Sequence, residues 1–264
     1  MRQFLYHSGM SIASAVVFIV FLLNNICYGQ AGAGSASIYE TLSIVDMPTA
    51  GVLAKNSYSV NMSMFSNGGF LVGFLIAPLS NVNLGISYSA TGLIGADNIT
   101  FQNLPGFLLN WRILDETKSS PAILIGVNTQ GRGMYLTSKK RFITYSPGIY
   151  AAISKSFKWE LGVFAWHGGI NYTFEQTAGT KTASLWLGFE HSIGPDGGIY
   201  FEFNPNFADK DRTIASHSPL FNGGLRWSVS RGITIELLVR DMFEYSLLNQ
   251  GFERWFGISF NRHF

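Results

Sequence analysis

The sequence predicts an all-β protein, a transmembrane antiparallel up-and-down β-barrel of about twelve strands. Three features predict this fold: a strictly alternating stretch at the end of the chain, a series of similar segments before it, and a regular succession of short and long connections. Alternation with a period of two residues is the pattern of a strand whose two faces differ. An even number of strands is typical of single-chain bacterial barrels.

The final stretch, residues 253–264, carries four large apolar side chains on one face and small or polar ones on the other. The apolar face holds Phe256, Ile258, Phe260 and Phe264, and the other face holds Gly257, Ser259, Asn261 and His263. The stretch resembles the closing strand of bacterial outer-membrane β-barrels, which carries the assembly signal of that class. The resemblance implies that the segment from Phe256 to Phe264 binds the barrel-assembly machinery.

Eleven further segments repeat this pattern, separated by turn signals such as Asn67-Gly68-Gly69. With the last stretch, the predicted strands are 57–66, 70–79, 81–90, 105–114, 121–130, 144–157, 160–175, 182–193, 198–206, 219–230, 232–242 and 253–264.

The connections alternate in length, as expected when short turns face the periplasm and longer loops face outward. Short ones lie at 78–80, 115–120, 158–159, 194–197 and 231, and long ones at 91–104, 131–143, 208–218 and 243–252. Two connections predicted on the outer side, 67–69 and 176–181, are also short. This phase places both ends of the barrel in the periplasm.

Apolar residues at alternate positions then face lipid, and closure removes the sheet edges that lipid cannot hydrate. The predicted outward faces are Phe107/Leu109/Trp111/Ile113, Phe164/Trp166/Ile170/Tyr172, Ala183/Leu185/Leu187/Phe189 and Ile233/Ile235/Leu237/Val239. A soluble β-sandwich, whose core would also alternate, is the alternative fold.

Composition supports export to a membrane. Of 264 residues, 47% are hydrophobic and 13% charged, whereas a soluble domain carries about 25% charged residues. We expect a signal peptide over 1–30, cleaved near 29–33; an uncleaved anchor is the alternative, but its apolar core is shorter than the ~20 residues of a span. A periplasmic segment over 31–56 and a barrel over 57–264 follow. The formal charge of +2, without a basic block, argues against nucleic acid as a partner.

Inward positions carry polar and charged side chains, which we predict to line the lumen, the space that the barrel encloses. They are Arg112, His167, Asn171, Glu190, Glu202, Arg226, Glu236 and Arg240. A hairpin centred on Arg231 sets Arg226 opposite Glu236 and predicts an ion pair. A loop centred near 178–179 sets His167 opposite Glu190, and Glu202 is expected close to Glu190.

Catalysis is the competing hypothesis, because carboxylates near a histidine can act in acid–base chemistry. Under this hypothesis the protein is an outer-membrane enzyme that modifies lipid or glycan, and its candidate residues are His167 and Glu190. The chain has no His-Glu-x-x-His pattern, and Asp209, Asp211 and Asn206 could hold a loop calcium ion, although a polar external loop explains them as well. We predict a protein that is not an enzyme and has no metal or cofactor.

The segment from Ile44 to Leu53, with Asp46-Met-Pro-Thr-Ala-Gly51, precedes a meander that contains Gly85-Ile-Ser-Tyr-Ser89. Together with His167-Gly-Gly-Ile-Asn-Tyr172 and Gly223-Gly-Leu-Arg-Trp227, these motifs resemble YjbH-type outer-membrane β-barrels. The resemblance implies a role in exopolysaccharide production and export.

The expected partners are outer-membrane lipid and either polysaccharide or small solutes. An open pore, a plugged lumen and a purely structural barrel remain open, and residues 44–53 could plug the barrel or cap its periplasmic mouth.

Overall fold

The structure, a computed structural model, describes residues 40–264 except 96–97, 177–181, 217 and 249–250. The predicted signal peptide and its cleavage site lie outside the described residues. Among the residues described, no helix has the length and hydropathy of a membrane span. The described strands are β1 (Ser57–Phe65), β2 (Gly69–Leu79), β3 (Val82–Thr91), β4 (Thr100–Phe101), β5 (Gly106–Leu114), β6 (Ala122–Asn128), β7 (Arg132–Leu136), β8 (Arg141–Thr144), β9 (Gly148–Trp159), β10 (Gly162–Tyr172), β11 (Ser184–Ile193), β12 (Gly197–Asn204), β13 (Leu220–Ser230), β14 (Ile233–Arg240) and β15 (Glu253–His263).

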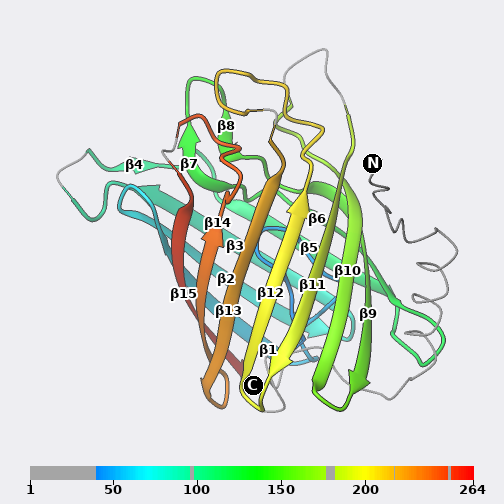
Figure 1. Cartoon of the computed structure of the whole chain (residues 1–264). Coiled ribbons are helices and arrows are strands. Elements are labelled where there is room, and N and C mark those ends of the chain that lie inside the picture. Colours follow the sequence, from blue (N-terminus) through cyan, green and yellow to red (C-terminus); the bar gives the residue numbers. More distant parts are fainter. Residues whose placement is uncertain (1–39, 96–97, 177–181, 217, 249–250) are drawn as a thin grey trace, which may run out of the picture.

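Within the described part of the chain, twelve of these strands form a closed antiparallel barrel (Figure 1). Sequence neighbours pair around the wall, with β3 joined to β5 and β6 to β9 where β4, β7 and β8 intervene in the sequence. The barrel closes where β15 pairs with β1, from Ser57 opposite His263 to Met64 opposite Phe256. The predicted fold class is therefore confirmed, and the alternating C-terminal stretch is the strand that closes the barrel.

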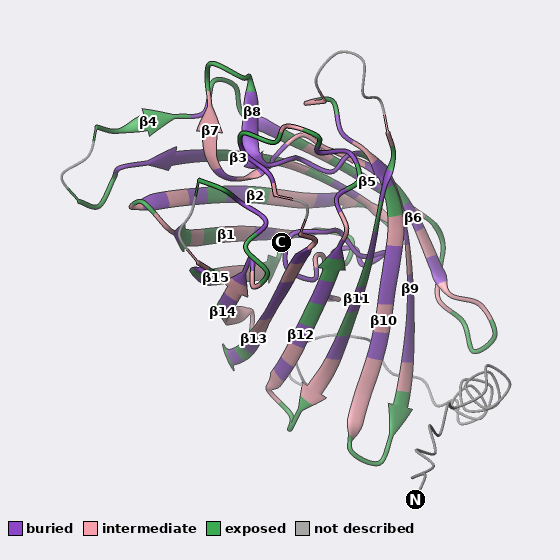
Figure 2. Ribbon diagram, turned by 45° about the horizontal axis from the view of Figure 1, so that its top comes forward, coloured by how far each residue is buried: buried purple, intermediate pink, exposed green. Residues whose placement is uncertain are grey.

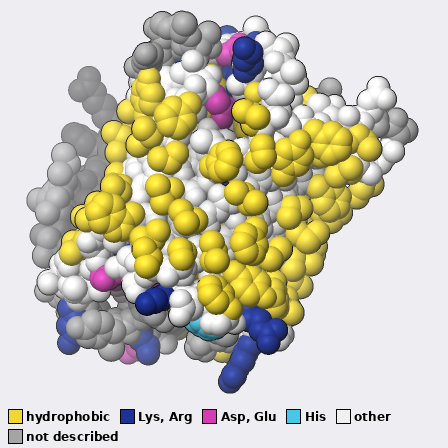
Figure 3. Space-filling view, turned by 180° about the vertical axis from the view of Figure 1, so that it is seen from behind, with side chains coloured by type: hydrophobic (Ala, Val, Ile, Leu, Met, Phe, Trp, Pro, Cys, Tyr) yellow, Lys and Arg dark blue, Asp and Glu magenta, His cyan; other side chains and the backbone are white. Residues whose placement is uncertain are grey.

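Alternation decides which face of each strand meets lipid. On β11, Leu185, Leu187 and Phe189 are 49%, 53% and 45% exposed, whereas the intervening Trp186 is 1% exposed. Figure 2 shows this alternation as bands along the strands, and Figure 3 shows the apolar side chains gathered over one outer surface of the barrel. The predicted outward faces are confirmed on β5, β10, β11 and β14. An apolar exterior on a closed barrel is the arrangement that hydrocarbon requires.

The short and long connections gather at opposite ends of the barrel, as predicted. In Figure 1 the tight turns lie at the bottom with the C-terminus, and the long loops lie at the top with β4, β7 and β8. The sequence analysis missed these three short strands. It also began the strand 144–157 too early, since β8 ends at Thr144 and β9 begins at Gly148. Pro147 has no N–H to donate, and Gly148 has a φ of 69°, so the chain cannot continue as a strand between them.

Residues 40–56, which we call the inner segment, lie inside the barrel. The sequence placed them in a periplasmic segment over 31–56; instead, Ile44, Val45, Met47 and Val52 are at most 5% exposed and belong to the same buried cluster as Leu124 and other residues of the barrel strands. A twelve-strand barrel is wider than the eight-strand size that side chains alone can fill. The inner segment therefore completes an apolar core to which inward side chains of the wall also contribute.

Candidate functional site

Asp46 anchors the inner segment through contacts with charged side chains. Its carboxylate accepts hydrogen bonds from Arg240 at 2.8 Å to Nε and 2.5 Å to Nη2, and Arg132 Nε lies 3.4 Å away. Arg240 also donates from Nη1 to Glu253 at 2.5 Å, and its guanidinium lies over the ring of Trp255. The predicted lumenal Arg240 is thus shared between the inner segment and the wall.

Glu202 holds the backbone of the inner segment. One carboxylate oxygen accepts the N–H groups of Val45, Asp46 and Met47 at 3.0, 2.9 and 2.8 Å. Its other oxygen accepts a hydrogen bond from Asn222. Three convergent backbone donors to one buried carboxylate form a charge-assisted site that fixes the bend at residues 45–47. The segment therefore carries the donors, and the wall carries the acceptor.

Arg226, on the neighbouring strand β13, binds the residues just before this bend. It donates from Nη2 to the carbonyl oxygens of Ser43 at 2.7 Å and Ile44 at 2.6 Å, and from Nε to Glu236 at 2.5 Å. Arg226 and Glu236 are opposite residues of the β13–β14 hairpin, so the predicted register and ion pair are confirmed.

The register of the β10–β11 hairpin differs from the prediction by two residues. His167 lies opposite Gly188, and Glu190 lies opposite Ala165. A polar connection of this length is compatible with several registers, so the sequence alone did not define which residues of the two strands pair. His167 Nε2 still lies 3.9 Å from Glu190 Oε2, on a diagonal of the sheet.

Gly188 is also the residue opposite Glu202, and Glu190 lies opposite Tyr200, so Glu202 and Glu190 are diagonal neighbours on adjacent strands. A Cβ atom at Gly188 would lie 2.1 Å from Ile44 Cδ1. The missing side chain makes the recess that receives Ile44. Glycine here is required by the close approach of the inner segment.

The residues proposed for catalysis also contact the inner segment. Ser154 Oγ lies 2.8 Å from His167 Nδ1, which brings serine, histidine and glutamate together. However, Ala50 donates its N–H to Ser154 Oγ at 2.9 Å, and the Thr41 hydroxyl donates to Glu190 at 2.7 Å. Ser154 and Glu190 therefore bind the inner segment, and His167 lies between these two side chains.

The remaining two predicted residues lie near opposite ends of the barrel. Arg112 binds Glu40 of the inner segment, and Asn171 donates to the carbonyl of Pro147 at 2.9 Å. Of the eight predicted residues, six are buried, and Arg112 and Glu236 are half-buried. That they border a water-filled path stays a prediction, because most of them bind the inner segment in this structure.

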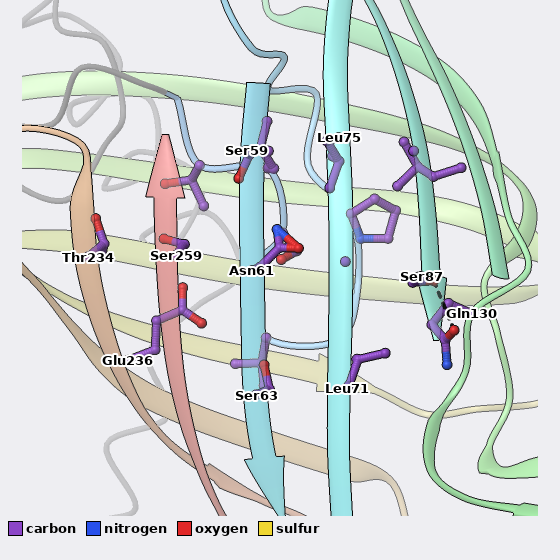
Figure 4. A pocket seen from close by; sticks show the side chains of 18 of the residues that line it. Ser59, Asn61, Ser63, Leu71, Leu75, Ser87, Gln130, Thr234, Glu236 and Ser259 are labelled. Carbon is purple, nitrogen blue, oxygen red and sulfur yellow. Dashed lines mark hydrogen bonds between the residues drawn. The ribbon is translucent and has the colours of Figure 1, made fainter. Parts of the chain in front are cut away.

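A cavity of about 220 Å³ remains beside the inner segment (Figure 4). Its lining differs from the charged side of the lumen, because five short neutral polar side chains of β1 and β15 form one wall. This neutral wall consists of Ser59, Asn61, Ser63, Ser259 and Asn261. Ser259 and Asn261 belong to the polar face predicted for the last strand, but none of the five was predicted as a site residue. The register that brings the two strands together was not readable from the sequence.

The outer loops are fastened to one another above the lumen. Arg141 of β8 forms a two-oxygen ion pair with Asp209, at 2.9 and 2.5 Å, and the Tyr245 hydroxyl also donates to Asp209. Asp209 is therefore engaged by other loops. In the described part of the chain, no group of three or more His, Cys, Asp or Glu side chains is arranged to hold a metal ion.

Asp211 makes a second link between these loops, through Lys139 Nζ at 2.6 Å. Burial alone would raise the pKa of the Asp211 carboxyl, but the hydrogen bonds from Lys139 and Thr213 outweigh it and lower that pKa to about 2. The link is thus ionised at any pH that the outer surface normally meets.

No protein-family profile matches the chain, and no curated protein matches it significantly. Among solved structures it is similar to a KdgM porin (12% identity, 78% of this chain, 99% of that one, TM-score 0.45) and to a NanC porin (10%, 78%, 99%, 0.41). It is also similar to the Acinetobacter baumannii outer membrane protein Omp33 (8%, 79%, 97%, 0.41). At these values the similarities assign neither a substrate nor a residue role. The closed barrel and its apolar exterior place the chain in the bacterial outer membrane, where such barrels lie.

Proposed function

We propose that the protein is an outer-membrane channel whose lumen is narrowed by its own inner segment. The observation that carries the proposal is the cavity of about 220 Å³ left between that segment and the wall of β1, β2, β3 and β15. The cavity borders Gly232 in a short turn and Arg132 beyond the outer end of β6. Lining residues near both ends of the barrel support a path for small solutes along this cavity.

The inner segment acts as a constriction because it is held by hydrogen bonds and ion pairs inside the barrel. Its charged anchors, Asp46 to Arg240 and the bend at Glu202, lie on β12 and β14, and Ala50 is held by Ser154 of β9. The neutral wall of β1 and β15 follows β14 around the barrel. The segment therefore narrows the lumen, and the cavity beside the neutral wall is the part that remains passable.

The test is single-channel conductance with the inner segment locked or released. A disulfide between Ala50→Cys and Ser154→Cys would lock the inner segment to β9 when oxidised and release it when reduced. Cys27, the single cysteine in the sequence, lies in the predicted signal peptide and does not compete for this disulfide. Steps in both oxidised and reduced protein support a permanent path beside the segment. Steps in the reduced protein alone support a path that opens when the segment moves. Heat-dependent migration of the protein on gels shows that the barrel is folded. If such a folded barrel gives no conductance steps in either the oxidised or the reduced state, the channel is refuted.

A plugged scaffold is the second candidate, and the burial of the inner segment favours it. Phe65 and Trp255 stack with ring centres 4.6 Å apart and are at most 8% exposed, so little water reaches this part of the lumen. Under this hypothesis the reduced and oxidised proteins are both closed.

Polysaccharide export is a finer proposal, supported by the YjbH resemblance of the Asp46 motif. A cavity of about 220 Å³ holds the volume of roughly seven waters at about 30 Å³ each, so a polysaccharide could pass only after the inner segment leaves. Passage of fluorescent dextran into vesicles by reduced but not oxidised protein tests it. Recognition of Phe256–Phe264 by the barrel-assembly machinery also stays a proposal, supported by the place of β15 as the closing strand.

A further inference from the structure

The neutral wall is a set of hydrogen-bonding groups with few partners in the protein. Ser59 lies opposite Asn261 and Asn61 opposite Ser259 where β1 and β15 close the barrel. Among the described residues, the side chains of Ser59, Asn61, Ser63 and Ser259 make no hydrogen bond to another protein group. Ser59 is only 1% exposed, and Figure 4 shows it among the residues around the cavity. Asn61, Ser63 and Ser259 are half-buried along the cavity. A buried polar group such as the Ser59 hydroxyl is normally paired, so the neutral wall offers free hydrogen-bonding groups to water or to a ligand.

The charges that border the cavity are already compensated. Of the described residues that line it, the charged ones are Glu40, Asp46, Arg132, Arg226 and Glu236. Each has an opposite charge nearby: Glu40 binds Arg112, Asp46 binds Arg240 with Arg132 close by, and Arg226 binds Glu236. An ion that entered would lose hydration without gaining a free counter-charge. The cavity therefore favours neutral solutes over ions.

The lining next to the neutral wall is partly apolar. Leu71 and Leu75 of β2 are the register partners of Ser63 and Ser59, as Figure 4 shows, and Leu108 lines the cavity from β5. A ligand that meets both surfaces needs hydroxyl groups on its edge and C–H groups on its face. A cyclic polyol or a monosaccharide ring has this distribution.

Glycines keep the space open. A Cβ atom at Gly73 would lie 2.4 Å from Asn61 Oδ1, and one at Gly85 would lie 3.1 Å from Leu75 Cγ. Larger residues at these inward positions would fill the cavity or displace the amide of Asn61. The volume of about 220 Å³ is below the ~300 Å³ at which drug-sized ligand pockets begin, which limits the ligand to a small molecule.

We propose that this cavity binds a neutral, cyclic, polyhydroxylated solute of monosaccharide size, held by hydrogen bonds to the neutral wall and by contact of its ring with the leucines. The proposal rests on the proposed function only for the route by which the solute reaches the cavity. It names the solute class of the channel and a binding site within it.

The test is equilibrium binding to the detergent-solubilised protein, measured by calorimetry with glucose as the probe. Gluconate and glucosamine serve as an anion and a cation of nearly the same size. We expect saturable glucose binding that is at least about tenfold tighter than that of either charged analogue. Asn61→Leu removes hydrogen-bonding groups and should weaken glucose binding by about tenfold or more.

Asn103→Leu is the matched control, because Asn103 is exposed in the loop between β3 and β5 and does not line the cavity. Ser259→Ala is a second variant that removes a hydroxyl without adding volume, should Asn61→Leu fail to give a heat-modifiable barrel. Equal affinity for glucose, gluconate and glucosamine, or equal loss in the Asn61 and Asn103 variants, would overturn the proposal. Unchanged binding in Ser259→Ala together with Asn61→Leu would overturn it as well.

Conductance separates this proposal from the proposed function. Glucose binding by a barrel that never conducts supports the site and refutes the channel. Conductance steps that glucose neither blocks nor shortens, with no calorimetric binding, refute the site and leave the channel standing. Partial block of the current by glucose but not by gluconate supports both.

Discussion

Replacement of Asp46 by alanine should release the inner segment. Asp46 and Arg240 are a buried pair, 3% and 2% exposed, joined at 2.5 and 2.8 Å. Loss of one partner from a buried pair costs about 3–5 kcal/mol, since the other charge stays buried. Arg240 keeps its contact with Glu253, so we expect the lower end, about 3 kcal/mol. Since about 1.4 kcal/mol corresponds to a factor of ten, the equilibrium constant between the docked and the released segment should shift by roughly 100-fold toward release.

Hydrogen exchange reports this equilibrium directly. The amides of Val45, Asp46 and Met47 are protected by Glu202 and exchange when the segment opens locally. In Asp46→Ala, protection of the peptide that covers residues 40–53 should fall by about 100-fold, while strands β9 to β12 keep theirs. The matched control is Asp211→Ala, which breaks a partly exposed ion pair worth at most about 1 kcal/mol. Equal protection of residues 40–53 in the two variants would refute the anchoring role of Asp46.

Three further outcomes are expected. Gly188→Leu should fill the recess of Ile44 and cost about 1–3 kcal/mol of docking, seen as faster exchange over residues 40–53; unchanged exchange would mean that Ile44 simply rotates away. Glu236→Gln should leave a buried cation uncompensated at the cavity and shift the reversal potential toward anion selectivity; an unshifted potential would mean that this residue lies off the conducting path. The carboxyl of Asp211 should titrate near pH 2 by carbon NMR rather than near 3.8, so that the link to Lys139 is complete above about pH 4 and is lost as the pH falls toward 2. Replacement of Lys139 by Met should raise that midpoint.

The barrel wall was largely predictable because its pattern is local. Each of the twelve wall strands falls where alternating residues predicted it, with ends that differ by up to a few residues. The pair Arg226–Glu236 was also predictable, since a turn of a residue or two fixes the register of its hairpin. The pair His167–Glu190 was not, because its turn lies in a longer polar connection where several registers keep the same face inward.

Short strands within loops were missed for a related reason. β7 and β8 total nine residues, and their pairing is stabilised by contacts with other loops, such as Arg141 with Asp209. Such contacts join residues that are 68 positions apart in the chain. A periodic pattern over four or five residues is too short to predict them.

A closed, lipid-facing barrel is predictable from the amino-acid sequence, because the alternation of side chains and the lengths of the connections are local features. The segment that fills the barrel is held by long-range contacts and is visible only in the folded structure. Asp46 and Glu202 are 156 positions apart in the chain. No sequence pattern near either residue shows that the Glu202 carboxylate accepts the backbone N–H of Asp46. The neutral wall likewise depends on the pairing of β1 with β15, which closes the barrel. Closure brings the two ends of the chain together, and that contact has no local signal.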